Sequence, residues 1–264
     1  MKRKINFLDL GNQPLANYYL KKKQIKNKEK KYRLVVCFDT TTKMVSIKKT
    51  FSSKMMFNNK YPYRSSMSRT MQKSFKYLSD DIKRKFKPKK ILEIGSNDGS
   101  FLKNFSKNMS IGIEPCSNVE KITKKMKFNT IADYWGIDLA KKILKKFDKV
   151  DLIYSANTIS HIKNLDNVFR SINIVLSNDG VLIIEDPSLL ECLKRNTYDQ
   201  FYNEHIYVFS YLALENILKK YNLEIFRIEN LDIHGGSNRY FIKKMTSNRK
   251  IENSVKNQKK KENK

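Results

Sequence analysis

Apolar and polar residues follow two different periods along this chain, and the change of period divides it into elements. Short apolar runs predict buried strands at 90–94, 110–114, 128–132, 150–156 and 180–185. Between these runs, apolar residues recur every three or four positions, which predicts helices at 99–108, 117–126, 136–147 and 165–176. Strands that alternate with helices indicate a parallel sheet with helices on both faces.

The pattern also predicts elements on either side of this region. A helix is expected at 68–86, a second helix at 208–221, and an antiparallel pair of strands at 223–228 and 238–243 that closes the sheet. The chain thus divides into a small irregular module (1–65), an α/β domain (66–243) and a Lys-rich tail (244–264) that we expect to be disordered. Within the first module we expect a turn at 11–15, a charged loop at 21–31 and a strand at 32–38.

Composition narrows the class of protein. The chain is 40% hydrophobic and 30% charged, and neither a membrane-length apolar run nor a signal peptide is visible, so we expect a globular cytoplasmic protein without a membrane partner. Cys37, Cys116 and Cys192 are widely spaced, which argues against a disulfide framework and against a complete metal site.

The net charge of +28 suggests a nucleic-acid partner, but its distribution argues otherwise. Forty-four lysines are scattered along the chain, against only ten arginines. Arginine is the residue that reads bases and phosphates with two parallel hydrogen bonds. We therefore expect a solvated lysine-coated surface and no specific nucleic-acid partner.

Residues 91–100 join an apolar strand to a loop of small residues, and the next strand ends in Glu114, 19 residues after Gly95. Gly95 and Gly99 let the backbone turn sharply and approach a ligand, while Glu114 is placed to bind two ribose hydroxyls. Asp98 would repel a pyrophosphate, so S-adenosylmethionine (SAM), which is cationic and has no phosphate, fits this loop better than NAD does. The alternative is an ordinary strand-to-helix turn with a surface glutamate.

Each of the three histidines follows a strand or precedes one. His161 lies just beyond the fourth strand, His205 follows the fifth, and His234 precedes a double glycine before the last. Ligands of open α/β sheets bind outside the carboxyl ends of the strands. We therefore predict one shared rim, composed of Asn157, His161, Glu185, Tyr202, Glu204 and His205. The alternative is that each histidine is a satisfied polar group, and for His234 this interpretation is the stronger one.

Seven motifs in the same order resemble the sugar C-methyltransferases that use SAM, such as the nucleotide-hexose 3-C-methyltransferases. They are LGNQPLAN at 10–17, YPYRSS at 61–66, LEIGSNDGS at 92–100, GIEP at 112–115, Ala156-Asn157 with His161, YNEH at 202–205, and HGGS at 234–237 with Arg239. The resemblance implies a class I SAM-dependent methyltransferase fold, which is Rossmann-like, with a seven-stranded sheet and an antiparallel last strand.

The resemblance also implies a role for each matching residue. His205 would be the base that removes a proton beside a ketone, and Glu204 would orient it. Tyr202, Tyr63 and His161 would contact the sugar or its enolate oxygen. The residues implied to hold the cofactor are Glu93, Gly95, Asn97, Gly99, Glu114, Pro115 and Asn157.

Three departures from the family pattern qualify this prediction. Only Cys37 remains of the four thiols of an N-terminal zinc module, so zinc is not expected. The family's His-Glu-His is Asn203-Glu204-His205 here. The chain stops before the family's C-terminal domain, and three explanations stay open: a partner chain replaces that domain, the substrate differs, or the gene is truncated. The alternatives are a truncated or catalytically impaired SAM-binding relative that needs a partner subunit and, less favoured, a nucleic-acid methyltransferase.

Overall fold

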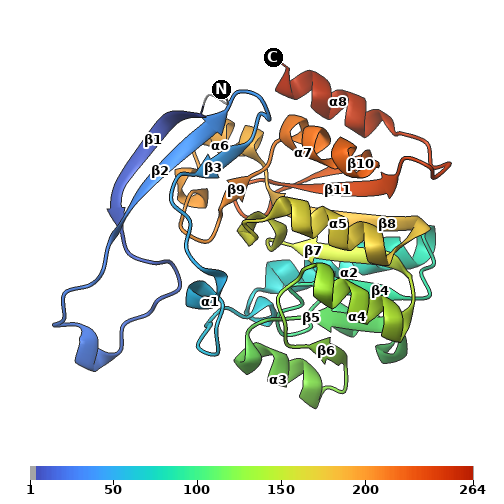
Figure 1. The fold of residues 1–264 in the computed structure, drawn as a ribbon, viewed down its shortest axis with the longest axis horizontal. Coiled ribbons are helices and arrows are strands. Elements are labelled where there is room, and N and C mark those ends of the chain that lie inside the picture. Colours follow the sequence, from blue (N-terminus) through green and yellow to red (C-terminus); the bar gives the residue numbers. More distant parts are fainter. Residues whose placement is uncertain (1–3, 264) are drawn as a thin grey trace.

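The computed structural model describes residues 4–263, which contain a large sheet of seven strands in the order β10-β11-β8-β7-β4-β5-β6 (Figure 1). The bounds of its strands are β4 Ile91–Ile94, β5 Ser110–Ile113, β6 Asn129–Ile131, β7 Val150–Ala156, β8 Leu176–Pro187, β10 Leu223–Leu231 and β11 Ser237–Lys244. Strands β6, β5, β4, β7 and β8 are parallel, whereas β11 is antiparallel to both β8 and β10. The predicted seven-stranded sheet with an antiparallel closing pair is confirmed.

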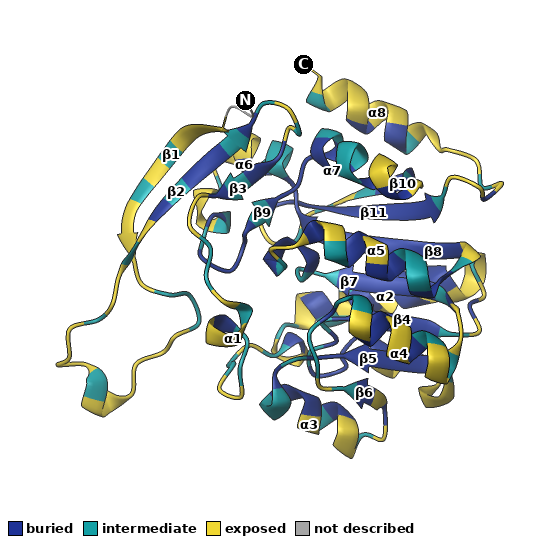
Figure 2. Cartoon of the chain, viewed as in Figure 1, coloured by how far each residue is buried: buried dark blue, intermediate teal, exposed yellow. Residues whose placement is uncertain are grey.

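Helices cover both faces of this sheet (Figure 2). Their bounds are α1 Ser53–Met56, α2 Arg69–Lys85, α3 Ser117–Lys125, α4 Ile137–Phe147, α5 Leu165–Val175, α6 Leu189–Arg195, α7 Tyr211–Leu218 and α8 Asn253–Glu262. Helix α2 packs on one face, and α4, α5 and α7 contribute to the core on the other. None of the helices within residues 4–263 combines the length and the apolar character that crossing a membrane requires.

Helix α2 shows how the sequence determines these elements. The Ser68 hydroxyl accepts the backbone N–H of Met71 and caps the first turn, as the N-cap rule requires. Phe75 and Ile82 lie on the face turned towards the sheet and are buried, whereas the last turn carries three basic residues that suit the negative end of the helix.

A second, smaller sheet contains β1 Lys4–Gln13, β2 Tyr32–Asp39, β3 Val45–Ile47 and β9 Tyr207–Val208, all antiparallel. Its fourth strand therefore comes from the segment just after His205 and ties the N-terminal residues to the α/β domain. The strand predicted at 32–38 is confirmed. The turn predicted at 11–15 is wrong at its start, because β1 continues to Gln13 through an irregular pairing in which Gly11 has φ +70°.

Two sequence predictions are wrong about elements. The helix expected at 99–108 is replaced by two short 3-10 helices, Leu102–Asn104 and Lys107–Met109. The Asn104 side chain donates to the carbonyls of Ser100 and Phe101, which competes with regular helical bonding. The tail expected to be disordered contains α8, because the segment before and within it covers the free edge of β10.

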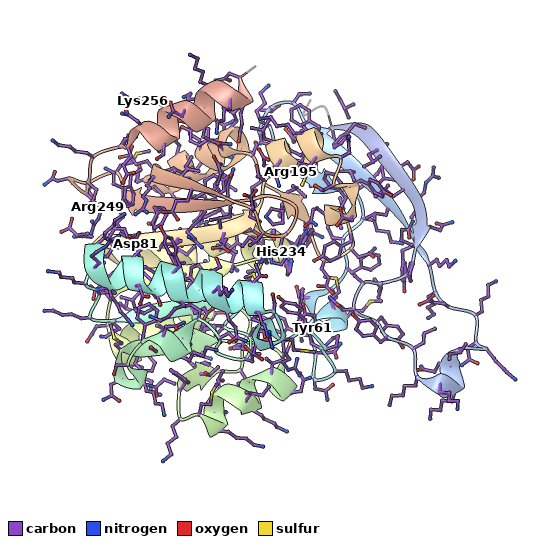
Figure 3. All side chains as sticks on the ribbon, turned by 180° about the vertical axis from the view of Figure 1, so that it is seen from behind. Tyr61, Asp81, Arg195, His234, Arg249 and Lys256 are labelled. Atoms are coloured by element: carbon purple, nitrogen blue, oxygen red, sulfur yellow. The ribbon has the colours of Figure 1, made fainter. Side chains whose placement is uncertain are left out.

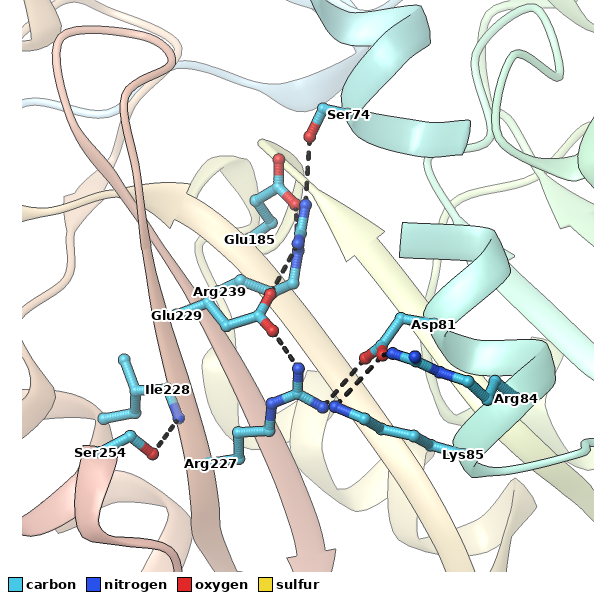
Figure 4. A network of polar contacts seen from close by, with 10 residues as sticks. All are labelled: Ser74, Asp81, Arg84, Lys85, Glu185, Arg227, Ile228, Glu229, Arg239 and Ser254. Carbon is cyan, nitrogen blue, oxygen red and sulfur yellow. Dashed lines mark hydrogen bonds and ion pairs between the residues drawn. The ribbon is translucent and has the colours of Figure 1, made fainter. Parts of the chain in front are cut away.

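A chain of buried charges joins α2 to the antiparallel end of the sheet (Figure 4). Arg239 is 1% exposed, and its guanidinium donates to Glu185, Glu229 and Ser74. Arg227 continues the chain from Glu229 to Asp81 in α2. Buried charges are costly unless they are paired, and here each guanidinium has carboxylate partners, so the network links β8, β10, β11 and α2 through ion pairs.

Candidate functional site

A cavity of about 800 Å³ opens beside the carboxyl ends of β4, β5 and β7 and is bounded by residues of the N-terminal module. Most of the residues predicted for the site line it, namely Tyr63, Glu93, Gly95, Asn97, Glu114, Pro115, Asn157, His161, Tyr202 and His205. His234 and Tyr61, both labelled in Figure 3, line it as well. Gly99, Glu204 and Glu185 are not among its lining residues.

The loop after β4 is shaped by backbone angles that favour glycine. Gly95 has φ +74°, and a Cβ added there would lie 2.2 Å from Thr158 Oγ1. The Gly95 and Ser96 amides both donate to the Ile113 carbonyl, which fixes the loop against β5. Glycine is therefore required at position 95 both by its backbone angle and by the close approach of Thr158.

Asp98 and Gly99 serve the structure of the loop. Asp98 is buried and accepts the Ser66 amide and the Ser100 hydroxyl. Gly99 has φ +77°, and a Cβ there would meet Thr123 of α3 at 2.9 Å. The structure thus places Gly99 in packing against α3 rather than at the cavity. The charge of Asp98, which the sequence analysis used to exclude a pyrophosphate, is turned towards hydrogen-bond donors of the chain.

Two buried carboxyl groups lie at the base of the cavity. Glu114 accepts the backbone amides of Asn97 and Cys116, at 2.9 and 2.8 Å. Burial raises the pKa of Glu114, although these amides oppose the shift. Burial, together with the neighbouring Asp98 and Glu114, raises the pKa of Glu93 well above its usual value. Glu93 Oε2 has no hydrogen-bond partner within residues 4–263, so it is available to a ligand.

His205 and Tyr202, which also line the cavity, form a hydrogen-bonded pair. His205 Nδ1 lies 2.8 Å from the Gln200 carbonyl, which can only accept, so Nδ1 carries the proton and Nε2 keeps its lone pair. The Tyr202 hydroxyl lies 2.9 Å from Nε2 and donates to it. Burial lowers the pKa of His205 to about 4, so the ring is neutral near pH 7.

The expectation that Glu204 orients His205 is wrong. The Glu204 carboxylate accepts Asn17 Nδ2 at 2.9 Å and the Tyr61 hydroxyl at 3.4 Å, and the Gln200 carbonyl takes the orienting position beside His205. Burial raises the pKa of Glu204 to about 7. Sequence reasoning missed Gln200 because any residue type supplies a backbone carbonyl. Asn17 and Tyr61 lie within two of the family motifs, and these motifs are the only feature of the sequence that points to them as site residues.

His161 lies between two rings of the cavity wall. Its ring stacks on Phe57 with centroids 5.3 Å apart and on His205 with centroids 5.0 Å apart. Burial lowers the pKa of His161 well below its usual value, and its Nε2 has no partner among the described residues. A neutral imidazole nitrogen without a partner beside a cavity is available to a polar group of a ligand.

The residues present do not fit a structural zinc site. Cys37 is the one thiol of the first 65 residues, and it lies beside the Asn6 side chain, with Sγ 3.2 Å from Oδ1. Within residues 4–263, no three His, Cys, Asp or Glu side chains gather in a way that would hold a metal ion. A structural zinc site in which protein ligands fill every position needs four such ligands. The absence of zinc stays a prediction.

Comparison with known proteins identifies the family of the chain. A family model described as a methyltransferase domain matches residues 63–228, and one described as a putative zinc binding domain matches residues 1–57. The chain is 27% identical over 149 residues to C-methyltransferase NovU of Streptomyces niveus. That alignment covers 56% of this chain and 36% of NovU, so the chain spans about a third of the relative that it matches.

Solved structures share the fold. The PH0226 protein from Pyrococcus horikoshii OT3 superposes with a TM-score of 0.52 and 17% identity, over 69% of this chain and 94% of that one. The plantazolicin methyltransferase BamL, solved with a triazolic desmethylPZN analog and SAH, gives a TM-score of 0.50 and 14% identity, over 68% of this chain and 88% of that one. At these identities the likeness concerns the fold alone.

Proposed function

This chain belongs to the methyltransferase domain family and has the class I SAM-dependent fold, and on that premise we propose that it methylates a carbon atom of a small keto compound, with nucleotide-linked keto-deoxysugars as the substrate class. The observation that carries the proposal is that one cavity joins the Gly95–Glu114 end to the His205–Tyr202 end. C-methylation requires that one substrate carbon meet both a proton acceptor and a methyl donor, and a single cavity lined by both sets of residues can hold substrate and cofactor together.

The residues at the first end fit the cofactor. The Gly95 loop lines the cavity, and the Glu114 carboxylate keeps lone pairs for ribose hydroxyls beyond the two amides that it accepts. Glu93 Oε2 is buried without a partner and would receive the cofactor's ammonium group. When bound, SAM supplies an electrophilic methyl group on a sulfonium.

The residues at the second end fit proton removal. A C–H beside a ketone is acidic enough for a general base, and the His205 Nε2 lone pair is such a base once substrate displaces the Tyr202 hydroxyl. The Gln200 carbonyl holds the other nitrogen protonated and so stabilises the imidazolium that forms. The freed Tyr202 hydroxyl then donates to the enolate oxygen, and the His161 ring, stacked on the His205 ring, is a further contact for that substrate.

The test is mass spectrometry of the purified chain incubated with methyl-labelled SAM and a panel of 4-keto-6-deoxy nucleotide sugars. We expect a labelled methyl on a sugar carbon, with turnover reduced at least about 100-fold in His205→Asn because general-base catalysis is worth that much. Tyr198→Phe is the matched control, since Tyr198 lies in the same segment with its side chain exposed and outside the cavity.

A second candidate is a SAM-binding relative that is catalytically impaired or needs a partner subunit. One observation favours it: the Glu204 carboxylate accepts hydrogen bonds from Asn17 and Tyr61, and a backbone carbonyl rather than this carboxylate lies beside His205 Nδ1. Calorimetry with SAM separates the two candidates. Binding of SAM without transfer to any sugar of the panel supports the impaired relative, whereas failure to bind SAM contradicts both.

A further inference from the structure

Residues 14–31, which we name the basic loop, connect β1 to β2 and extend away from both sheets (Figures 1 and 2). Apart from one short 3-10 helix, Lys22–Gln24, the segment lacks secondary structure. Its apolar side chains point into solvent rather than into a core, with exposed fractions of 59% for Tyr18, 75% for Tyr19, 37% for Leu20 and 66% for Ile25. Exposed apolar side chains that gather in one segment mark an interaction site.

The charge of the basic loop is of one sign. Seven lysines lie at 21, 22, 23, 26, 28, 30 and 31, against the single acidic residue Glu29. None of these seven ammonium groups forms an ion pair with a carboxylate of the described chain. The loop therefore offers a concentrated positive charge that the folded protein does not neutralise.

We propose that the basic loop docks this protein onto the surface of an anionic lipid bilayer. Lysines attract the negative surface of such a bilayer, and exposed Tyr, Leu and Ile side chains enter the boundary between headgroups and acyl chains. Single-stranded nucleic acid is the other polyanion, and the loop suits it less. Tyr18 and Tyr19 offer faces on which bases stack, but the loop contains no arginine, and the exposed aliphatic side chains of Leu20 and Ile25 suit an acyl boundary and not a base.

The attachment of the loop places this contact beside the cavity. Ala16 and Asn17, at the start of the loop, line the cavity, and the Asn17 side chain donates to Glu204. The base of the loop is thus fixed to the site while the segment beyond it is exposed. The sequence-based expectation of no membrane partner rested on the lack of an apolar span, and a peripheral contact needs none.

The experiment is co-sedimentation of the full chain with vesicles, either of phosphatidylcholine alone or mixed with phosphatidylglycerol. The test variant carries Lys21→Gln, Lys22→Gln, Lys23→Gln and Lys26→Gln. The matched control carries Lys141→Gln, Lys142→Gln, Lys145→Gln and Lys146→Gln, which remove the same charge from exposed positions of α4. Circular dichroism confirms that both variants are folded.

We expect binding only to the anionic vesicles, weakened at least about tenfold in the loop variant and less than about twofold in the α4 variant. A second variant, Tyr19→Ser with Ile25→Ser, keeps the charge and should also lose affinity, because it removes the side chains that enter the bilayer. If the loop and α4 variants lost equal affinity for the anionic vesicles, binding would depend on net charge alone, and the proposal would be overturned. Loop-dependent binding to single-stranded RNA without binding to vesicles would overturn it as well.

Discussion

Gly95 combines a left-handed backbone angle with a close neighbour, and the two constraints can be separated. Its φ of +74° strains any L-residue, and a Cβ would meet Thr158 Oγ1 at 2.2 Å. Gly11 has nearly the same φ, +70°, but a Cβ there meets nothing within 4 Å. Alanine substitutions at Gly11 and Gly95 therefore separate the cost of backbone strain from the cost of a steric clash.

We expect Gly11→Ala to cost about 1 kcal/mol in the free energy of unfolding, and Gly95→Ala to cost about 3 kcal/mol or more because it adds a clash to the strain. Urea denaturation of both variants measures this. Equal costs would show that Thr158 yields without penalty and that the angle alone demands glycine at position 95.

At the residue scale, the sequence predicted most of the side chains at the cavity and few of their partners. Gly95, Glu114 and His205 were identified from motif and strand position, because the carboxyl ends of parallel strands meet along one edge. The partner of His205 was not predictable, since a carbonyl leaves no mark in the sequence. Glu204 illustrates the same limit: it is adjacent to His205 in the chain, yet its side chain faces Asn17 and Tyr61.

At the scale of elements, α8 is the clearest departure from expectation. Its composition is typical of a disordered tail, and Val255 and Gln258 are the buried side chains that anchor it. The Glu252 amide donates to the Phe226 carbonyl, and Ser254 Oγ accepts the Ile228 amide. This segment thus satisfies backbone groups of the edge strand β10. Hydrophobic periodicity could not reveal it, because Val255 is the one buried apolar side chain of α8 and the contacts of the segment with the β10 backbone are polar.

Helix α8 also caps another helix. Glu262 accepts the backbone amides of Tyr211 and Leu212 in the first turn of α7, at 3.0 and 3.1 Å. Removing a cap from a helix end costs about 1–2 kcal/mol. We therefore expect Glu262→Ala to lower the free energy of unfolding by that amount, measured by urea denaturation. Lys260→Ala, at an exposed position of the same helix, should change it by less than about 0.5 kcal/mol. Similar effects of the two changes would contradict the cap.

At the scale of the whole molecule, stability should depend on pH through groups buried near the cavity. The pKa of Glu204 is raised to about 7 by burial, and that of Asp186 to about 8 by the same cause. A carboxyl group whose pKa is raised on folding binds more protons in the folded state, so its contribution is complete below the unfolded pKa and is lost as pH rises through the folded value. His205, with its pKa lowered to about 4, acts in the opposite direction and loses its contribution as pH falls from about 6.5 to 4.

Because these effects partly cancel, the test compares wild type with Glu204→Gln. Between about pH 4.5 and 7.5 the variant should gain up to about 3 kcal/mol relative to wild type, since glutamine does not pay for ionisation inside the protein. Urea denaturation at a series of pH values gives the difference curve. A flat curve would place Glu204 in contact with water in solution.

The arrangement of the small sheet has a consequence for the order of folding. Its strand β3 ends at Ile47, and its last strand, β9, begins at Tyr207, which is 160 positions later. At about 5–20 residues per second of synthesis, the ribosome needs roughly 10–30 s to deliver that strand. The edge of β3 therefore has no strand partner while the central strands are synthesised. The N-terminal sheet becomes complete only after most of the chain has been made.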